Sequence, residues 1–186
     1  VYTTTLDGRG SHNVRVENAP AGAEVRLEGL DLRNGQDGIH IWVGRVHIER
    51  CSIRDANKQG IEVDGGDVVI SATRIVRAQQ GVEVDAGRVE LTNVYIARTG
   101  EEGLLVEGGD GVTLTHSIIE QCSLQGVQVN RGTLHLFDNT IRHISADGIR
   151  VESGVVSVLS NTIYSIASDG LDVSGTHIIS GNLVYG

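Results

Sequence analysis

Short runs in which apolar and polar residues alternate recur along most of the chain. Each run opens with a glycine, which is followed by an apolar, a variable and a second apolar position. The opening glycines are 21 to 23 residues apart, and they are Gly38, Gly60, Gly81, Gly103, Gly126, Gly148 and Gly170. A recurrence of this length is the sequence signature of a solenoid, in which each repeat forms one coil.

Each repeat contains three short apolar segments, which we predict to be β-strands. In the repeat that begins at Gly148, the apolar positions are Ile149, Val151, Val156, Val158, Ile163 and Ile166. Alternation with a period of two places one side chain inward and the next outward, as in a half-buried strand. Short segments that are rich in valine and isoleucine and separated by glycine are too brief and too β-branched for helices.

A single coil of this kind cannot bury its own apolar face, but stacked coils can. If each strand pairs in parallel with its equivalent one coil away, at a spacing of about 4.8 Å, the apolar columns form a continuous core. The predicted fold is therefore all-β, a single-stranded right-handed parallel β-helix of about eight coils of ~22 residues. A leucine-rich repeat has a similar period, but its characteristic leucine and asparagine pattern is absent.

The whole chain, residues 1–186, is predicted to be one domain with less regular ends. Residues 1–20 form an irregular first coil, with a loop at 19–22. The early positions that fit strands are Tyr2, Thr4, Leu6, Val14, Val16, Val25, Leu27, Leu30 and Leu32. Residues 170–186 form an incomplete last coil, whose apolar side chains would be open to solvent. This favours either a piece of a longer β-helix or ends that stack on other copies, and we expect the isolated chain to self-associate end to end.

Charge and composition narrow the classes of partner. The formal net charge is −9, and Lys58 is the only lysine. Nucleic acids and anionic membranes bind basic surfaces, so neither is an expected partner. No apolar run approaches the ~20 residues of a membrane span. The chain begins without methionine or a signal peptide, which indicates processing or excision from a longer protein. Cys51 and Cys122 fall in distant coils and are predicted to be buried, unpaired thiols.

Acidic residues gather at outward positions of the first strand in successive repeats. One outward column begins with His40, Glu62 and Glu83, and its neighbour begins with Trp42, Asp64 and Asp85. We call these six residues the acidic face. Carboxylate oxygens are the ligands that Ca²⁺ prefers, so Glu62, Asp64, Glu83 and Asp85 are the candidate metal ligands and Ca²⁺ is the one candidate cofactor. The tryptophan ring suits packing against a sugar. A solvated acidic surface, calcium binding and glycan binding remain open interpretations.

Other polar columns suit structural roles. The residue before each opening glycine is polar, in the series Asp37, Gln59, Gln80, Glu102, Gln125, Asp147 and Asp169, and the last three repeats share Asn139, Asn161 and Asn182. We expect both columns on the outer surface, where they hydrogen-bond one another and the turn backbone. A second polar group consists of Arg150, Glu152 and Asp172. His47, His135 and His177 are isolated, and no histidine pair has the sequence spacing of a metal site.

From Val14 to Val184 the repeat resembles the pectate-lyase-like superfamily of right-handed β-helices, and it is most similar to the generic repeats of secreted bacterial proteins. The shared pattern is G-I-x-V-x-x-G-x-V-x-I-x-x-x-x-I. The resemblance implies an extracellular or cell-surface location in a bacterium, with acidic or neutral polysaccharides as candidate partners. Residues 168–173 are similar to the N-T-D-G-x-D strand of polygalacturonases, but the Asp-Asp, Gly-His-Gly and Arg-x-Lys motifs are absent. Pro20 is the only proline and lacks the context of the lyase motif R-x-P-x-x-R.

Regular coils, open ends and incomplete catalytic motifs favour a non-catalytic extracellular module with a structural, surface or adhesive role that self-assembles end to end. No residue is assigned a catalytic role, which disfavours an enzyme without deciding the matter. The alternative is a polysaccharide-active protein, namely a lyase, hydrolase or epimerase acting on acidic glycans, or else a calcium- or glycan-binding module.

Overall fold

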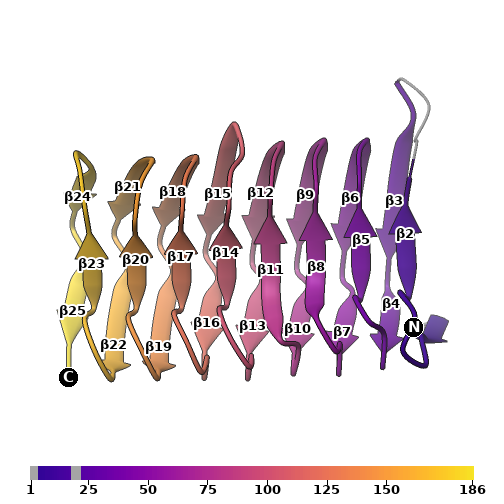
Figure 1. Ribbon diagram of the computed structural model, residues 1–186, viewed down its shortest axis with the longest axis horizontal. Helices are drawn as coiled ribbons and strands as arrows, with labels where there is room; N and C mark the ends of the chain where they lie inside the picture. The colour runs from indigo at the N-terminus through magenta and orange to yellow at the C-terminus, as the bar shows by residue number, and fades with distance from the viewer. Residues whose placement is uncertain (1–3, 18–21) are drawn as a thin grey trace.

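The chain winds into a stack of similar coils. The computed structural model describes residues 4–17 and 22–186, and within these residues all regular secondary structure is β-strand, without a helix. Figure 1 shows the coils side by side along the long axis of the molecule, with the two chain ends at opposite ends of the stack. The predicted all-β architecture of about eight coils is confirmed.

Three parallel sheets run along the stack, and each coil contributes one strand to each sheet. Sheet 1 contains β2 (Val14–Val16), β5 (Ile39–Ile41), β8 (Gln59–Val63), β11 (Gln80–Val84), β14 (Leu104–Val106), β17 (Val127–Val129), β20 (Ile149–Val151) and β23 (Leu171–Val173). Sheet 2 contains β3 (Glu24–Glu28), β6 (Arg45–Glu49), β9 (Asp67–Ser71), β12 (Arg88–Thr92), β15 (Gly111–Thr115), β18 (Thr133–Phe137), β21 (Val155–Leu159) and β24 (Ile178–Ser180). Sheet 3 contains β1 (Thr4–Asp7), β4 (Leu30–Arg33), β7 (Ser52–Arg54), β10 (Arg74–Val76), β13 (Tyr95–Ala97), β16 (Ile118–Glu120), β19 (Thr140–Ile144), β22 (Thr162–Ile166) and β25 (Leu183–Tyr185).

Equivalent positions of successive repeats stack in register. In sheet 1, for example, Ile149 of β20 pairs with Val127 of β17 on one side and with Leu171 of β23 on the other. Away from the two end coils, the inward valine, isoleucine and leucine side chains of all three sheets are almost completely buried and form one continuous core. The core positions predicted from the alternation are confirmed, because a period of two fixes which side chains face inward once the sheets are paired.

The first coil also follows the prediction where it is described. Thr4 and Leu6 lie in β1, and the predicted strands around Val14 and Val25 are β2 and β3. The strand predicted at Leu30 is β4. Tyr2 and the predicted loop residues 19–21 lie outside the described residues.

The two polar columns predicted to lie on the outer surface are largely buried, so that part of the prediction is wrong. Asp37 is 1% exposed, and Asp147 and Asn161 are also buried. The cause is local hydrogen bonding across coils. Oδ1 of Asp147 accepts a hydrogen bond from the amide of Asp169 at 3.1 Å, and Oδ1 of Asn161 accepts one from the amide of Asn139 at 2.9 Å. Each side chain turns toward a neighbouring coil because it satisfies a backbone donor there.

Glycine closes the turn between sheet 1 and sheet 2. Gly66 and Gly87 occupy consecutive coils of this turn with φ of 98° and 88°, a backbone conformation that disfavours any residue with a Cβ. As a result the turn stays short in these two coils, and the same number of residues separates the sheet 1 strand from the sheet 2 strand in each.

Cys51 and Cys122 are buried and unpaired, as predicted. Burial raises the pKa of Cys122 to about 11, so this thiol stays protonated at neutral pH. Within the described ranges, no helix has the length and apolar character needed to cross a membrane.

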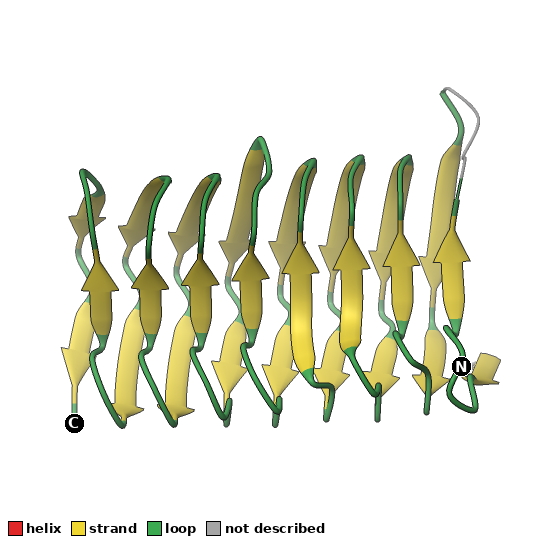
Figure 2. Ribbon diagram, viewed as in Figure 1, coloured by secondary structure: helices red, strands yellow, loops and turns green. Residues whose placement is uncertain are grey.

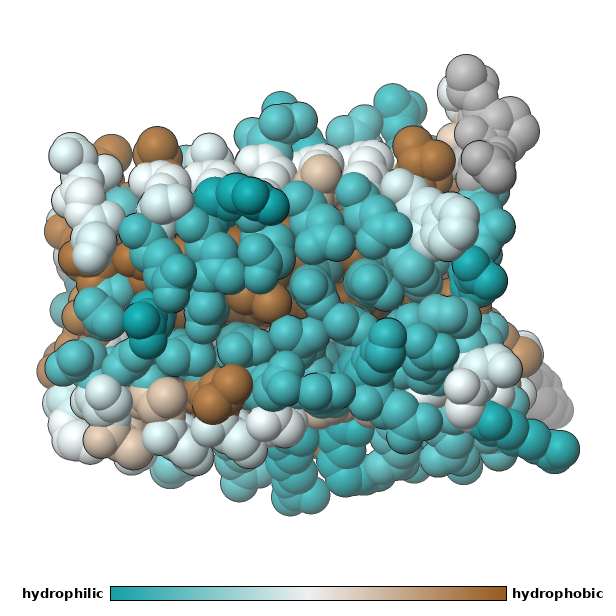
Figure 3. Space-filling view, in the orientation of Figure 1, coloured by the Kyte–Doolittle hydropathy of each residue, from teal (hydrophilic) through white to brown (hydrophobic). Residues whose placement is uncertain are grey.

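The last coil leaves large apolar side chains exposed. Ile178 is 66% exposed, and Ile179, Leu183, Val184 and Tyr185 are exposed as well. In Figure 3, brown apolar atoms are visible at the left edge, where this coil lies, whereas the broad front face is mostly teal. An apolar coil face with neighbours on one side only is unusual for a soluble surface.

Candidate functional site

The acidic face lies on the outward surface of sheet 1, over β5, β8 and β11. His40 pairs with Glu62, and Glu62 pairs with Glu83, so these three side chains form one column across three coils. The second column follows directly after the strands. The amide of Asp64 donates to the carbonyl of Ile41, and the amide of Asp85 donates in the same way to Val63. The structure therefore places the six residues in the two adjacent columns that the alternation predicts.

His40 is the centre of the contacts in the acidic face. Its Nε2 lies 3.0 Å from Oδ2 of Asp64, and its Nδ1 lies 3.4 Å from Oε2 of Glu62. Nε1 of Trp42 donates a hydrogen bond to Nδ1 of His40 at 3.3 Å. Since the carboxylate can only accept, Nε2 of His40 carries the hydrogen, and Nδ1 presents a lone pair. His40 is thus hydrogen-bonded to Trp42 and Asp64, and the Glu62 carboxylate lies beside its Nδ1.

Trp42 has a partly exposed ring that is held from one side. The residue is 42% exposed. The guanidinium of Arg15, from β2, lies 5.1 Å from the ring centroid. A cation at this distance from an indole face is a favourable contact, so the ring has a fixed position beside the acids. A rigid, half-exposed aromatic ring is the kind of surface on which a pyranose ring can pack.

Three carboxyl groups of the acidic face, those of Glu62, Glu83 and Asp85, have a pKa above the ordinary value. Burial raises the pKa of Glu62, and the neighbouring charges of Asp37, Asp64 and Glu83 raise it further against the opposing effect of His40. Burial also raises the pKa of Glu83 and of Asp85. Hence these three groups hold a proton more tightly than an isolated carboxylate does.

Glu83 and Asp85 are held differently from Glu62 and Asp64. Glu83 accepts a hydrogen bond from the side-chain amide of Gln59, which opposes the rise of its pKa. The pKa of Asp85 is raised mainly by burial and further by the negative charges of Asp64 and Glu107. The ligand atoms of His40, Glu62 and Asp64 lie within 4.8 Å of one another, and in the described part of the chain neither Glu83 nor Asp85 joins such a group. The predicted four-carboxylate calcium set is therefore spread over two coils and has His40 at one end.

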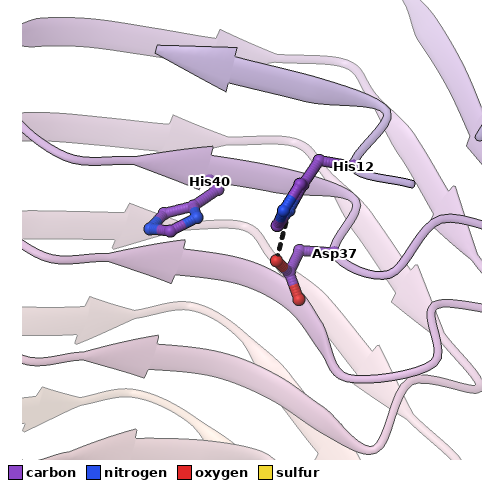
Figure 4. A group of neighbouring side chains, drawn as sticks. All are labelled: His12, Asp37 and His40. Atoms are coloured by element: carbon purple, nitrogen blue, oxygen red, sulfur yellow. Dashed lines mark ion pairs between the residues drawn. The ribbon is translucent and has the colours of Figure 1, made fainter. Parts of the chain in front are cut away.

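Two residues that the sequence analysis did not assign to the site lie beside His40. Figure 4 shows His12, Asp37 and His40 together, with the His12 ring facing the Asp37 carboxylate and the His40 ring to one side. Nδ1 of His12 lies 2.5 Å from Oδ2 of Asp37, and the His12 and His40 ring centroids are 5.5 Å apart. The three ligand atoms fall within 4.8 Å of one another. His12 precedes β2 in the irregular first coil, where no repeat alignment could have placed it beside His40.

The other polar residues singled out from the sequence do not join this site. Arg150 lies 3.6 Å from Glu152 and 3.9 Å from Asp172 in an exposed group several coils away. His177 is aligned with the inward position of Val156, and its Nδ1 accepts a hydrogen bond from the amide of that residue. Arg150 and His177 therefore have structural contacts within their own coils and the neighbouring ones.

An open groove runs along the turn between sheet 1 and sheet 2, next to the Trp42 end of the acidic face. It has a volume of about 680 Å³. Its lining includes Val43, Arg45, Asp67, Arg88 and Asp110, together with the turn glycines. Arg45, Asp67 and Arg88 are register partners, so positive and negative side chains alternate along the groove. The groove is open to solvent, and polar and apolar atoms contribute about equally to its lining.

Comparison with known proteins supports the fold and leaves the activity open. Residues 37–184 match the family model described as the right handed beta helix region. The match agrees with the resemblance to the pectate-lyase-like superfamily at the level of the fold. No curated protein and no solved structure matches the chain. Because the match covers most of the chain and the structure shows the same stack of coils, the chain belongs to the right-handed β-helix family.

Proposed function

We propose that the chain is a non-catalytic structural module of an extracellular or cell-surface protein, which stacks end to end on a second copy of itself. The observation that supports this most directly is the apolar last coil. Ile179 and Val184 of this coil are exposed although they belong to columns that are buried elsewhere, since they pair with the core residues Val158 and Ile163.

Both ends of the stack present matching columns. In sheet 3 a single column begins at Leu6 of the first coil and reaches Val184 in the last coil. In sheet 1 a column begins at Val14 and reaches Leu171. Leu6, Val14 and Leu171 are only partly buried, since each has a neighbour on one side. A second copy placed on the last coil would continue these columns in the same order.

Stacking of this type also satisfies the backbone. The strands at each end of a parallel sheet carry N–H and C=O groups that have no partner strand on one side. Joining the last coil of one copy to the first coil of another pairs these backbone groups. It also covers the apolar side chains, and this burial stabilises the contact by about 25 cal/mol per Å² of apolar surface removed from water. Because the two faces differ, the contact is head-to-tail and can repeat into a filament.

The test is the molar mass of the chain as a function of concentration, measured by light scattering after size exclusion. We expect the average mass to rise with concentration. Ile179→Lys, in the last coil, should reduce the rise, as should Leu27→Lys in the first coil, which is the other end of the same column. The matched control is Val155→Lys, because Val155 is 60% exposed on the side of the stack, in the coil before the last one. A strict monomer at high concentration, or equal association in all variants, would contradict the proposal.

A second candidate function is supported by the acidic face. Three carboxyl groups with raised pKa lie beside the partly exposed Trp42 and the groove, an arrangement that suits binding of Ca²⁺ or of a glycan, or the handling of an acidic polysaccharide by a lyase, hydrolase or epimerase. The test is incubation with a panel of acidic and neutral polysaccharides, with and without Ca²⁺, scored for binding and for new reducing or unsaturated ends. Trp42→Ala should abolish glycan binding in this case. Retention of none of the polysaccharides by the wild-type chain would count against this function.

A further inference from the structure

We infer that His12, Asp37 and His40 form a binding site for a divalent transition-metal ion of the Zn²⁺ class, separate from the end-to-end contact. We call these three residues the histidine–aspartate site. The inference is independent of the proposed structural role, because it concerns the side of the first two coils and not the ends of the stack.

The strongest support is the buried carboxylate of Asp37. The residue is 1% exposed. Its Oδ1 accepts a hydrogen bond from the amide of Gln59 at 3.4 Å, which is the structural role that Asp147 repeats five coils further along. Oδ2 of Asp37 and Nδ1 of His12 are both buried, and among the described residues neither atom has a hydrogen-bond partner of acceptable geometry, although the two lie 2.5 Å apart. A buried carboxylate oxygen that lacks a donor is costly, and a bound cation removes that cost.

His40 is already oriented as a metal ligand. Its Nε2–H donates to Oδ2 of Asp64, which leaves the Nδ1 lone pair free to coordinate a cation. Histidine ligands of metal ions usually donate their other ring N–H to a carboxylate or carbonyl in this way. The hydrogen bond from Trp42 to Nδ1 confirms that this nitrogen serves as an acceptor, and a metal ion would take the place of that weak 3.3 Å contact.

The ligand types select the class of ion. Two imidazole nitrogens and one carboxylate suit Zn²⁺ and its first-row neighbours, whereas Ca²⁺ takes six to eight oxygen ligands, roughly twice as many ligands as this site offers. Oε2 of Glu62 lies 3.4 Å from Nδ1 of His40, but it belongs with Asp64 to a separate group of ligand atoms around His40. The side chain of His12 is 20% exposed, so an ion can enter from that side.

The loop that carries His12 is held in place before any ion binds. The side-chain amide of Asn13 donates to the carbonyls of Leu6 and Arg33, at 2.9 and 3.0 Å. Gly8 packs so closely that a Cβ there would lie 2.7 Å from the Cα of Gly35. A metal ion bound to this loop and to residues 37 and 40 would tie the first coil to the second. Its binding energy would then add to the stability of the first coil.

The experiment uses the whole chain without a histidine tag, titrated with ZnCl2 by calorimetry and followed by thermal unfolding. We expect one Zn²⁺ per chain and a melting temperature that rises with Zn²⁺ concentration. His12→Ala and Asp37→Asn should abolish both effects. Asp64→Asn, which alters only the partner of His40, should weaken Zn²⁺ binding by about 10- to 100-fold. The matched controls are His135→Ala, which removes an exposed histidine far along the stack, and Asp147→Asn, which changes the equivalent buried carboxylate.

Each result decides the inference. His12→Ala lies in a surface loop, so an unchanged circular dichroism spectrum and metal-free melting temperature show that this variant is folded. No binding by the wild-type chain, or equal Zn²⁺ binding by wild type and His12→Ala, would overturn the inference. Binding that is lost in His40→Ala but retained in His12→Ala would also overturn it, because the ion would then be held by His40, Glu62 and Asp64.

Discussion

A Cβ atom at Gly126 would lie 2.6 Å from Cγ2 of Ile141, which belongs to sheet 3 of the same coil. It would also lie 2.6 Å from the carbonyl oxygen of Gly148, one coil further along. The opening glycines from Gly38 to Gly148 are therefore required by a close approach of the backbone to a core isoleucine and to the next coil. This relationship explains why glycine, and no other small residue, marks the repeat.

Gly126→Ala should therefore destabilise the chain. The added methyl group forces the isoleucine or the neighbouring coil to shift, and overpacking of this kind costs about 1–3 kcal/mol of the free energy of unfolding. The measurement is urea unfolding followed by circular dichroism. Gly111→Ala is the control, because no atom lies within 4 Å of a Cβ at that position. Equal effects of the two substitutions would show that the close approach is not the reason for the glycine.

Asn161→Ala should destabilise the stack, because Asn161 is the buried middle member of the column Asn139, Asn161 and Asn182. Oδ1 of Asn161 accepts from the amide and side chain of Asn139, and its own side-chain amide donates to the carbonyl of Leu136. Removal leaves buried backbone groups unpaired, at a cost of about 1–3 kcal/mol. Thermal unfolding measures the effect. Asn130→Ala, in a partly exposed position with side-chain partners only, should cost clearly less.

The stability of the acidic face should depend on pH in a defined direction. Burial raises the pKa of Glu83 above its ordinary value of 4.5. The folded chain then binds this proton more tightly than the unfolded chain, so the contribution of Glu83 to stability is full below that value and is lost as pH rises through the folded pKa. Glu83→Gln should thus change the free energy of unfolding little at about pH 3 and increase it at about pH 7.

The contribution of Asp147 to stability should depend on pH in the opposite direction to that of Glu83, so Asp147→Asn serves as the control for the pH experiment. Burial acts to raise the pKa of Asp147, but hydrogen bonds from Ser168 and from the amide of Asp169 outweigh it and hold the pKa below its ordinary value. Its contribution is present above the unfolded pKa and is lost as pH falls through the folded pKa. Asp147→Asn should therefore destabilise the chain at neutral pH and have little effect in acid. The same pH profile for both variants would contradict these assignments.

If the acidic face binds Ca²⁺, substitutions of its carboxylates should remove the stabilisation that Ca²⁺ provides. If Glu62, Asp64, Glu83 and Asp85 hold Ca²⁺, added CaCl2 should raise the melting temperature of the wild-type chain. The double substitution of Asp64 and Asp85 by asparagine should remove that rise, whereas Glu152→Gln, on an exposed part of the same sheet face, should leave it unchanged. An undiminished rise in the double variant would count against these ligands.

The fold could be predicted from the sequence because its rules are local and repeated. The alternation of Ile149 and Val151 fixes which face of a strand is inward, and the recurrence of the opening glycine fixes which strands pair. Even the irregular first coil follows from the same alternation at Val14 and Val16. Register errors are costly here, since a shift by one residue would expose every core side chain.

The site could be predicted only in part, because its contacts depend on how turns bend. The two columns of the acidic face follow from the strand register, and so does the proximity of His40 to Glu62 and Asp64. The burial of Asp37 depends on the turn before β5, whose path alternation does not describe. Leu105 shows the same limit, because it stands in an outward column and yet is only 6% exposed.

Electron microscopy of the concentrated chain tests the central claim most directly. Head-to-tail stacking predicts rods that have the width of one chain and the length of several chains. These rods should be shorter when Ile179 is replaced by lysine. Particles that keep the length of one chain at every concentration, or that associate only side by side, would contradict the account of this protein as an end-to-end structural module.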